Sequence, residues 1–124
     1  MTPEDMKKRT KAFALRAIRA AGALPRTQSG AVLGRQLLRA GTSVGANYRA
    51  ACRARSKSEF AAKLGIVEEE CDESLYWMEL IIEAGLLPRT KLSPLMKEAE
   101  EILAIVVASI TTARRSSAIK RGRQ

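Results

Sequence analysis

Apolar residues between positions 33 and 60 recur at the spacing of an α-helix, and this repeat constrains the fold more than any other feature. At 3.6 residues per turn they form one continuous stripe, made of Leu33, Leu37, Ala40, Val44, Tyr48 and Ala51. Four arginines fall on the opposite side of the same helix, namely Arg35, Arg39, Arg49 and Arg53. The segment therefore predicts a helix with one face in a core and one cationic face.

Small residues form a third strip on this helix, between the apolar and the cationic faces: Gly34, Gly41, Gly45 and Cys52. Each glycine inside a helix costs about 1 kcal/mol relative to alanine, so the strip needs a compensating contact. Close approach of another helix along the glycines would supply it, and we interpret Gly41 and Gly45 as packing positions. A kink near residues 41–43 is the alternative.

Three further segments show helical periodicity, and turn residues separate all four. The expected helices cover residues 3–22, 29–54, 57–85 and 94–115. Their expected starts are Thr2-Pro3, Ser29, a capping box of Ser56 with Glu59, and Ser93-Pro94. Four helices with short connections predict an all-α, antiparallel, up-down-up-down four-helix bundle in residues 1–115. The basic tail at residues 116–124 is expected to fray.

The last predicted helix is apolar over more than one face. Its main stripe contains Leu95, Met96, Ala99, Ile102, Leu103, Val106, Ile110 and Ala113, and Ile105 and Val107 lie outside that stripe. Such a helix needs more than one neighbour, so it lies either at the centre of the bundle or at a subunit interface. We favour the interface, because a small four-helix domain rarely buries one helix on all sides.

Positive charge dominates the chain, with 22 Lys and Arg against 13 Asp and Glu and a net charge of +9. Eight of the acids lie in residues 59–83, so the rest of the chain is strongly basic. This surplus favours a polyanion partner, with RNA or DNA first and an anionic membrane surface second. The predicted contact residues are Arg35, Arg39, Arg49 and Arg53, together with Arg16, Arg19, Arg114 and Arg115.

The alternative for the arginine stripe is a solvated face, or a face paired with the acids of residues 59–83. Aromatic residues make up only 4% of the chain, so few could stack on bases. Any nucleic-acid binding is therefore expected to use the phosphate backbone, with little sequence specificity.

The sequence does not favour an enzyme. It contains no histidine and two isolated cysteines, so an ordinary zinc site cannot be assembled within one chain. The carboxylates Glu69, Glu70 and Glu73 lack the histidines of di-iron bundles, and neighbouring carboxylates should raise the pKa of Cys71. We expect no catalytic residue, metal or cofactor.

The same sequence indicates a cytoplasmic protein. Its N-terminus has no signal-peptide pattern. The longest uncharged apolar run, residues 102–110, is far shorter than the roughly 20 residues that span a bilayer. No membrane partner is expected.

Four polar or aromatic residues are expected to have structural roles. Asn47 lies beside the core face and should hydrogen-bond across the bundle or a subunit contact. Tyr48, Tyr76 and Trp77 are expected to act as core or interface anchors.

Three short elements resemble a known family: SVGANY at residues 43–48, SKSEF at residues 56–60 and ECDESLYW at residues 70–77. The chain resembles the four helix bundle protein family, also called the 23S rRNA intervening-sequence protein or S23 family. The resemblance is sharpest over residues 33–87, and the flanking helices fit by length and placement. Many members carry Glu where this chain has Ala50, so an ion pair built on that acid is missing here.

The resemblance implies a left-handed bundle that assembles as a homopentamer. Members of the family occur as reading frames within insertions in bacterial 23S rRNA genes. Relatives serve as accessory proteins of diversity-generating retroelements, where a basic pentamer works with a reverse transcriptase and nucleic acid. Two functions therefore stand side by side: binding of nucleic-acid backbone, and a protein-interaction scaffold that docks a partner such as a reverse transcriptase.

Overall fold

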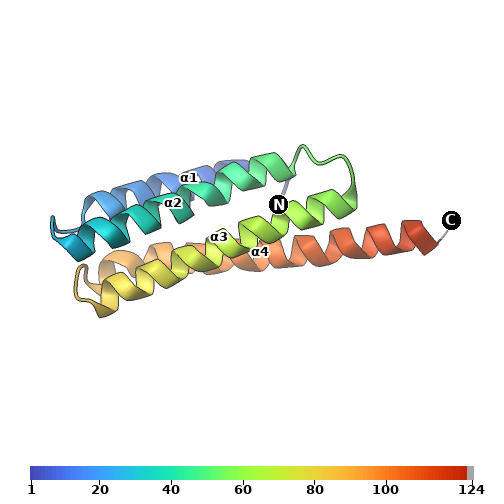
Figure 1. Ribbon diagram of the computed structural model, residues 1–124. Coiled ribbons are helices and arrows are strands. Elements are labelled where there is room, and N and C mark those ends of the chain that lie inside the picture. The colour runs from blue at the N-terminus through green and yellow to red at the C-terminus, as the bar shows by residue number, and fades with distance from the viewer. Residues whose placement is uncertain (123–124) are drawn as a thin grey trace.

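The chain folds into four helices that run antiparallel in chain order (Figure 1): α1 (Pro3–Gly22), α2 (Gln28–Ala51), α3 (Lys57–Glu83) and α4 (Arg89–Gly122). The computed structural model describes residues 1–122, apart from the side chains of residues 120 and 121. Each helix packs extensively on the next one in the sequence, whereas α1 and α4 touch far less. The predicted all-α up-down-up-down bundle is confirmed.

Side-chain caps explain where two helices begin. The Thr2 hydroxyl accepts a hydrogen bond from the Asp5 N–H at 3.1 Å, and the Asp5 carboxylate accepts one from the Thr2 N–H at 3.0 Å. The N–H that Thr2 donates to the carboxylate holds the pKa of Asp5 below its usual value. In α3, the Ser56 hydroxyl accepts from the Glu59 N–H, but the Glu59 carboxylate accepts from the N–H of Arg55. Only half of the capping box predicted there forms.

The bounds of α2 and α3 differ slightly from those expected. The cap of α2 is Thr27 rather than Ser29, because the Thr27 hydroxyl accepts the Gly30 N–H at 3.1 Å. This helix ends at Ala51, three residues before the expected position 54. In α3 the helix ends at Glu83, and Gly85 adopts a left-handed conformation with φ of 72°. Paired backbone hydrogen bonds then close the helix end as glycine permits.

The start expected for α4 at Ser93-Pro94 is wrong. The helix begins at Arg89, and the Ser93 hydroxyl donates to the Arg89 carbonyl at 2.7 Å instead of capping the helix. Pro94 is tolerated because its φ suits a helix and the lost backbone hydrogen bond lies near an exposed end. The helix also passes its expected end at residue 115, since it continues through the predicted tail to Gly122 and projects beyond the bundle (Figure 1). Residues 123 and 124 of that predicted tail lie outside the described residues.

The core follows the predicted stripes closely. The stripe of α2 is buried apart from the half-buried Leu33, and that of α4 is buried apart from the half-buried Met96 and Leu103. In α3 the buried side chains include Leu64, Val67, Met78 and Ile81, together with the polar Ser74. The largest fully buried side chains come from all four helices and include Phe13, Leu37, Leu64, Met78 and Ile102.

The glycine strip of α2 is explained by close approach of α1. A Cβ atom added to Gly41 would lie 2.5 Å from the Cβ of Ala17, which is closer than two carbon atoms can approach. A side chain at position 41 would therefore force the two helices apart. A Cβ on Gly45 would lie 3.3 Å from backbone atoms of Thr10. Buried Thr10 satisfies its own hydroxyl by donating to the Met6 carbonyl at 2.8 Å. The packing interpretation of Gly41 and Gly45 is therefore confirmed.

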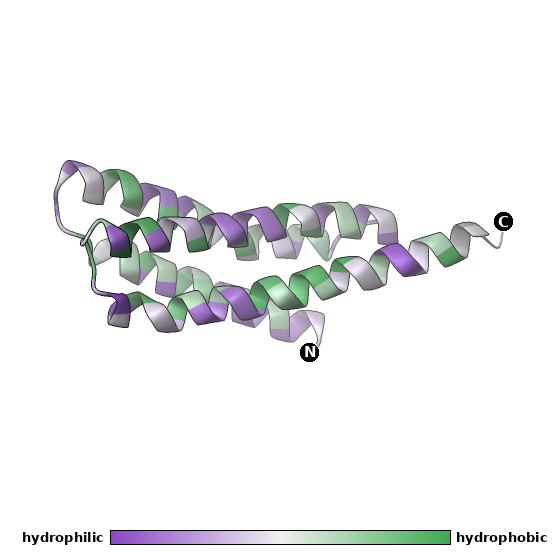
Figure 2. Cartoon of the chain, turned by 90° about the horizontal axis from the view of Figure 1, so that it is seen from below, coloured by the Kyte–Doolittle hydropathy of each residue, from purple (hydrophilic) through white to green (hydrophobic). Residues whose placement is uncertain are grey.

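Much of the second half of α4 is coloured hydrophobic in Figure 2, and some of its apolar side chains are exposed. Val107 is 43% exposed and Ile119 is 58% exposed. By length and composition, residues Arg89–Ile119 include a window apolar enough to cross a membrane. Only 22% of that window is buried within the bundle. The window is longer than the uncharged run at residues 102–110 because it includes Arg114 and Arg115. Because α4 packs mainly on α3, a central position in the bundle is excluded.

Candidate nucleic-acid interface

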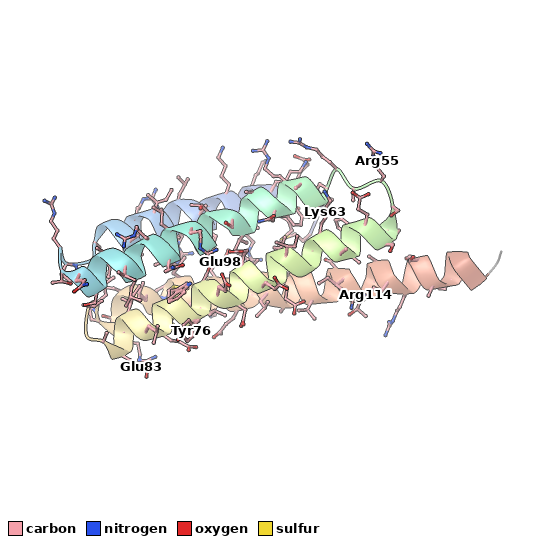
Figure 3. All side chains as sticks on the ribbon, in the orientation of Figure 1. Arg55, Lys63, Tyr76, Glu83, Glu98 and Arg114 are labelled. Atoms are coloured by element: carbon pink, nitrogen blue, oxygen red, sulfur yellow. The ribbon has the colours of Figure 1, made fainter. Side chains whose placement is uncertain are left out.

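Charge is divided between the two sides of the bundle. The α2 helix carries three arginines and no acidic residue, whereas α3 carries eight acids and two lysines. In Figure 3, nitrogen-tipped side chains project from the side of the molecule that α1 and α2 form. A polyanion approaching that side meets cations that nearby acids cannot neutralise.

Arg39 is the exception on the predicted stripe, because its charge is compensated within the chain. Its guanidinium donates to the Glu73 carboxylate at 2.7 Å and to the Glu70 carboxylate at 3.1 Å. The two carboxylates raise the pKa of Arg39, and the hydrogen bond to Glu73 makes the largest contribution. The alternative of pairing with the acids of α3 therefore applies to Arg39, and this residue is removed from the candidate interface.

The other three arginines of the stripe are exposed. Arg35 borders a groove between α1 and α2, beside Ile18 and Leu38. Arg49 lies toward the opposite end of α2 and borders a second groove against α1. Arg53 follows the end of the helix rather than lying on it, because Cys52 is the C-cap.

The remaining four predicted arginines lie elsewhere. Arg16 and Arg19 lie on the other side of α1, where they line a groove of about 430 Å³ with Lys91 of α4. Arg114 and Arg115 are exposed on α4, and Arg114 lies close to where this helix leaves the bundle (Figure 3). The structure thus divides the eight predicted arginines into three groups, and within the α2 group Arg35 and Arg49 border grooves against α1.

Lysines of α1 that the sequence analysis left out of the site belong to the same side. Lys7, Lys8 and Lys11 line the groove that contains Arg49. Their spacing already put them on one face of the helix, but nothing in the sequence placed that face beside Arg49. The pairing arises from the packing of α1 on α2 described above.

Arg9 of α1 has a different role, because it bridges the weakly packed pair α1 and α4. Its guanidinium grips the Glu98 carboxylate with two hydrogen bonds of 2.7 and 2.8 Å, and Glu101 lies 3.7 Å away. The hydrogen bond to Glu98 raises the pKa of Arg9, and the same bond lowers the pKa of Glu98. Only 24% and 18% of the two side chains are exposed, so this arginine is structural.

The four predicted structural residues divide into two outcomes. Tyr48 is 6% exposed and belongs to the core. Trp77 is half-buried and packs against the core. Asn47 does not reach across the bundle, since its amide donates to the Ser43 carbonyl of the same helix at 2.8 Å. Tyr76 is not a core residue either. It is 52% exposed, and its ring meets Trp77 edge to face at 5.0 Å.

Cys71 is buried, and its thiol donates to the Ala99 carbonyl at 3.1 Å. Burial raises the pKa of Cys71 to about 12, and Asp72 adds a smaller electrostatic contribution. The predicted direction was right, but burial rather than the carboxylates is the main cause. Among the residues that the structure describes, no three acidic, histidine or cysteine side chains gather closely enough to hold a metal ion.

The raised pKa of Cys71 predicts a loss of stability at alkaline pH. In the unfolded chain the thiol ionises near pH 9.0, whereas in the folded chain it stays protonated up to about pH 12. Stability from the neutral thiol is therefore complete below pH 9 and declines above it. Between pH 9 and pH 10.5 the wild type should lose about 2 kcal/mol more than Cys71→Ala. Urea unfolding with reductant present measures this, and parallel pH profiles for the two proteins would contradict it.

Comparisons with known proteins agree with this architecture. Residues 4–108 match the model of the family described as 23S rRNA-intervening sequence protein. A crystal structure of a protein of unknown function, from the S23 ribosomal protein family of Bacteroides thetaiotaomicron VPI-5482, superposes with a TM-score of 0.79. The two chains are 33% identical, and the match covers 85% of this chain and 97% of that one. No curated protein matches the sequence. This chain is a member of the 23S rRNA-intervening sequence protein family.

Proposed function

We propose that this protein binds the phosphate backbone of RNA or DNA through the side of the bundle that α1 and α2 form, as a non-enzymatic binding protein. The observation that carries the proposal is the division of charge. Arg35 and Arg49 are exposed there beside grooves against α1, Arg53 is exposed directly after the end of α2, and α2 contains no acid to neutralise them. The family description, which refers to 23S rRNA intervening sequences, supports a nucleic-acid partner.

Binding of this kind should show little preference for sequence. Phe13 and Tyr48 are buried in the core, and the other aromatic residues belong to α3. Among them, Tyr76 is the most exposed. Without rings beside the arginines, bases cannot stack on the interface, and arginine contacts to phosphates carry no sequence information.

Fluorescence anisotropy with labelled single-stranded RNA and single-stranded DNA, from 50 to 200 mM salt, tests the proposal. Affinity should fall steeply with salt, because each neutralised phosphate contributes about 0.7 to the slope of log K against log salt. Two unrelated sequences of equal length should bind within a few fold of each other. Absence of binding at 50 mM salt, or binding that salt does not weaken, would refute the proposal.

We also propose that the protein assembles into a homo-oligomer, with five subunits as the expected number, through the outward apolar surface of α4. Val107 is 43% exposed there, and the most apolar window of the helix is mostly uncovered. Such a surface is typical of a face that another subunit covers.

The variant Val107→Glu should dissociate the assembly, because an unpaired charge would then be buried at the interface. Ile18→Glu is the matched control, since Ile18 is 45% exposed on α1. Light scattering should give an oligomer for the wild type and the control, and a monomer for Val107→Glu. A monomeric wild type would refute the proposed assembly.

The protein-interaction scaffold is the second candidate function, and exposed Tyr76 favours it. Tyrosine is common at protein interfaces, and here it lies on the acidic helix α3, away from the proposed nucleic-acid side. A docked protein such as a reverse transcriptase would then contact α3. A partner whose binding is lost in Tyr76→Ala and kept when the arginines of α2 are replaced would favour this second candidate.

A further inference from the structure

A groove between α1 and α2 is lined by cations from both helices. On α1 the lining residues recur one helical turn apart, and on α2 a second series does the same: Glu4, Lys7, Lys8, Lys11 and Ala14 from α1, and Thr42, Gly45, Ala46 and Arg49 from α2. The groove measures about 540 Å³ and is open to solvent along one side. One face of α1 and one face of α2 therefore form the two walls of the groove.

The groove contains four cations and one acid. Lys7 is engaged by Glu4, whose carboxylate lies 3.1 Å from the lysine Nζ. Among the described side chains, no ion pair includes Lys8, Lys11 or Arg49. Three cations thus remain available to one ligand, two of them from α1 and one from α2.

Small residues keep the groove open at its α2 wall. Gly45 has no side chain because Thr10 of α1 comes within 3.3 Å of where its Cβ would lie. Ala46, the next residue, is exposed and adds only a methyl group. The two helices therefore approach closely beneath the groove, and the long side chains of Lys8, Lys11 and Arg49 can converge above it.

We infer that this groove binds a run of consecutive phosphates, with one phosphate chain lying between Lys8 and Lys11 on one side and Arg49 on the other. Lysines supply mobile point charges, and arginine can grip two phosphate oxygens at once. No aromatic ring lines the groove, so the rest of the ligand stays in solvent. As a site for a nucleic-acid strand, this inference rests on the function proposed above, whereas binding of a free polyphosphate does not.

The variant Ala46→Glu tests the groove by placing a carboxylate inside it, and Ala46→Gln fills the same space without charge. Both residues favour helix, so the fold should be kept. Relative to Ala46→Gln, Ala46→Glu should bind single-stranded RNA about tenfold more weakly at 50 mM salt. Its salt slope should decrease by about 0.7, which corresponds to one lost phosphate contact. Calorimetry with inorganic tripolyphosphate should show a parallel loss.

A second variant works in the opposite direction. Glu4→Gln removes the acid that engages Lys7, so RNA and tripolyphosphate should bind about threefold more tightly. Misfolding cannot produce such a gain. If Glu4→Gln weakens binding, or if Ala46→Glu and Ala46→Gln bind RNA equally, the groove is not the phosphate site.

The outcomes separate the two proposals. Wild-type protein that binds RNA with a salt slope, together with equal binding by the two Ala46 variants, keeps the proposed function and overturns the groove. Wild-type protein that binds tripolyphosphate but no RNA, with loss in Ala46→Glu, keeps the groove and overturns the proposed function. Wild-type protein that binds neither overturns both.

Discussion

Replacing Arg35, Arg49 and Arg53 with glutamate lowers the affinity for single-stranded RNA by about 100-fold or more at 50 mM salt. Each change removes a cation and adds an anion on α2 or directly after its end, and α2 has no acid of its own. Each lost phosphate contact lowers the salt slope by about 0.7, so the slope of the variant should be about 2 lower than that of the wild type. Anisotropy titrations of the variant and the wild type from 50 to 200 mM salt measure both effects.

The matched control has the same change in net charge on other surfaces. Lys57, Arg89 and Lys97 are exposed on α3 and α4, and two of them begin their helices, where glutamate is favourable. Their replacement by glutamate should weaken RNA binding much less. Arg39→Gln should also have little effect, because Glu70 and Glu73 already neutralise that charge. Equal losses in the two triple variants would mean that total charge, rather than the α1–α2 side, determines binding.

Phe13→Ala lowers the free energy of unfolding by about 3–5 kcal/mol, the range measured for removal of a buried aromatic ring. Phe13 is completely buried, and its ring lies beside Gly41 at the α1–α2 contact. The contact between α1 and α4 is slight, so α1 depends mainly on this side for its position. Loosening α1 also separates Lys8 and Lys11 from Arg49, so RNA affinity should fall with stability.

Urea unfolding followed by circular dichroism measures the loss of stability, at several protein concentrations because assembly would contribute. Phe13→Leu is the control, since it keeps most of the volume and should lose less than about 1.5 kcal/mol. A loss below about 1 kcal/mol for Phe13→Ala would show that α1 is held by other contacts, such as the ion pair of Arg9 with Glu98.

Local sequence was sufficient for most of the secondary structure. The start of α1 at Pro3 follows from the Thr2 cap, and the end of α3 follows from Gly85, because these signals act within a few residues. The Ser93-Pro94 signal is also local, and the prediction from it was wrong. A cap motif shows that a helix can begin at a residue, but burial of Leu92 and Leu95 in the core stabilises a helix that begins earlier, at Arg89.

Contacts between helices were beyond the reach of periodicity. A helical repeat tells which residues share a face, but not which other helix meets that face or at what register. Arg39 shared a face with three free arginines, and only the packing of α2 on α3 brought it to Glu70 and Glu73. Asn47 was expected to reach across the bundle, yet a carbonyl one turn away in its own helix satisfies it.

The sequence by itself determined the four helices, the core stripes, the glycine strip and the excess of positive charge, because each depends on residue type and spacing along one helix. The tertiary structure alone decided which cations remain unpaired and which of them meet. Lys8 and Lys11 face Arg49 because α1 rests against the glycines of α2, about thirty to forty residues further along the chain. Ion pairing and groove formation depend on distances between helices, and only packing determines those distances.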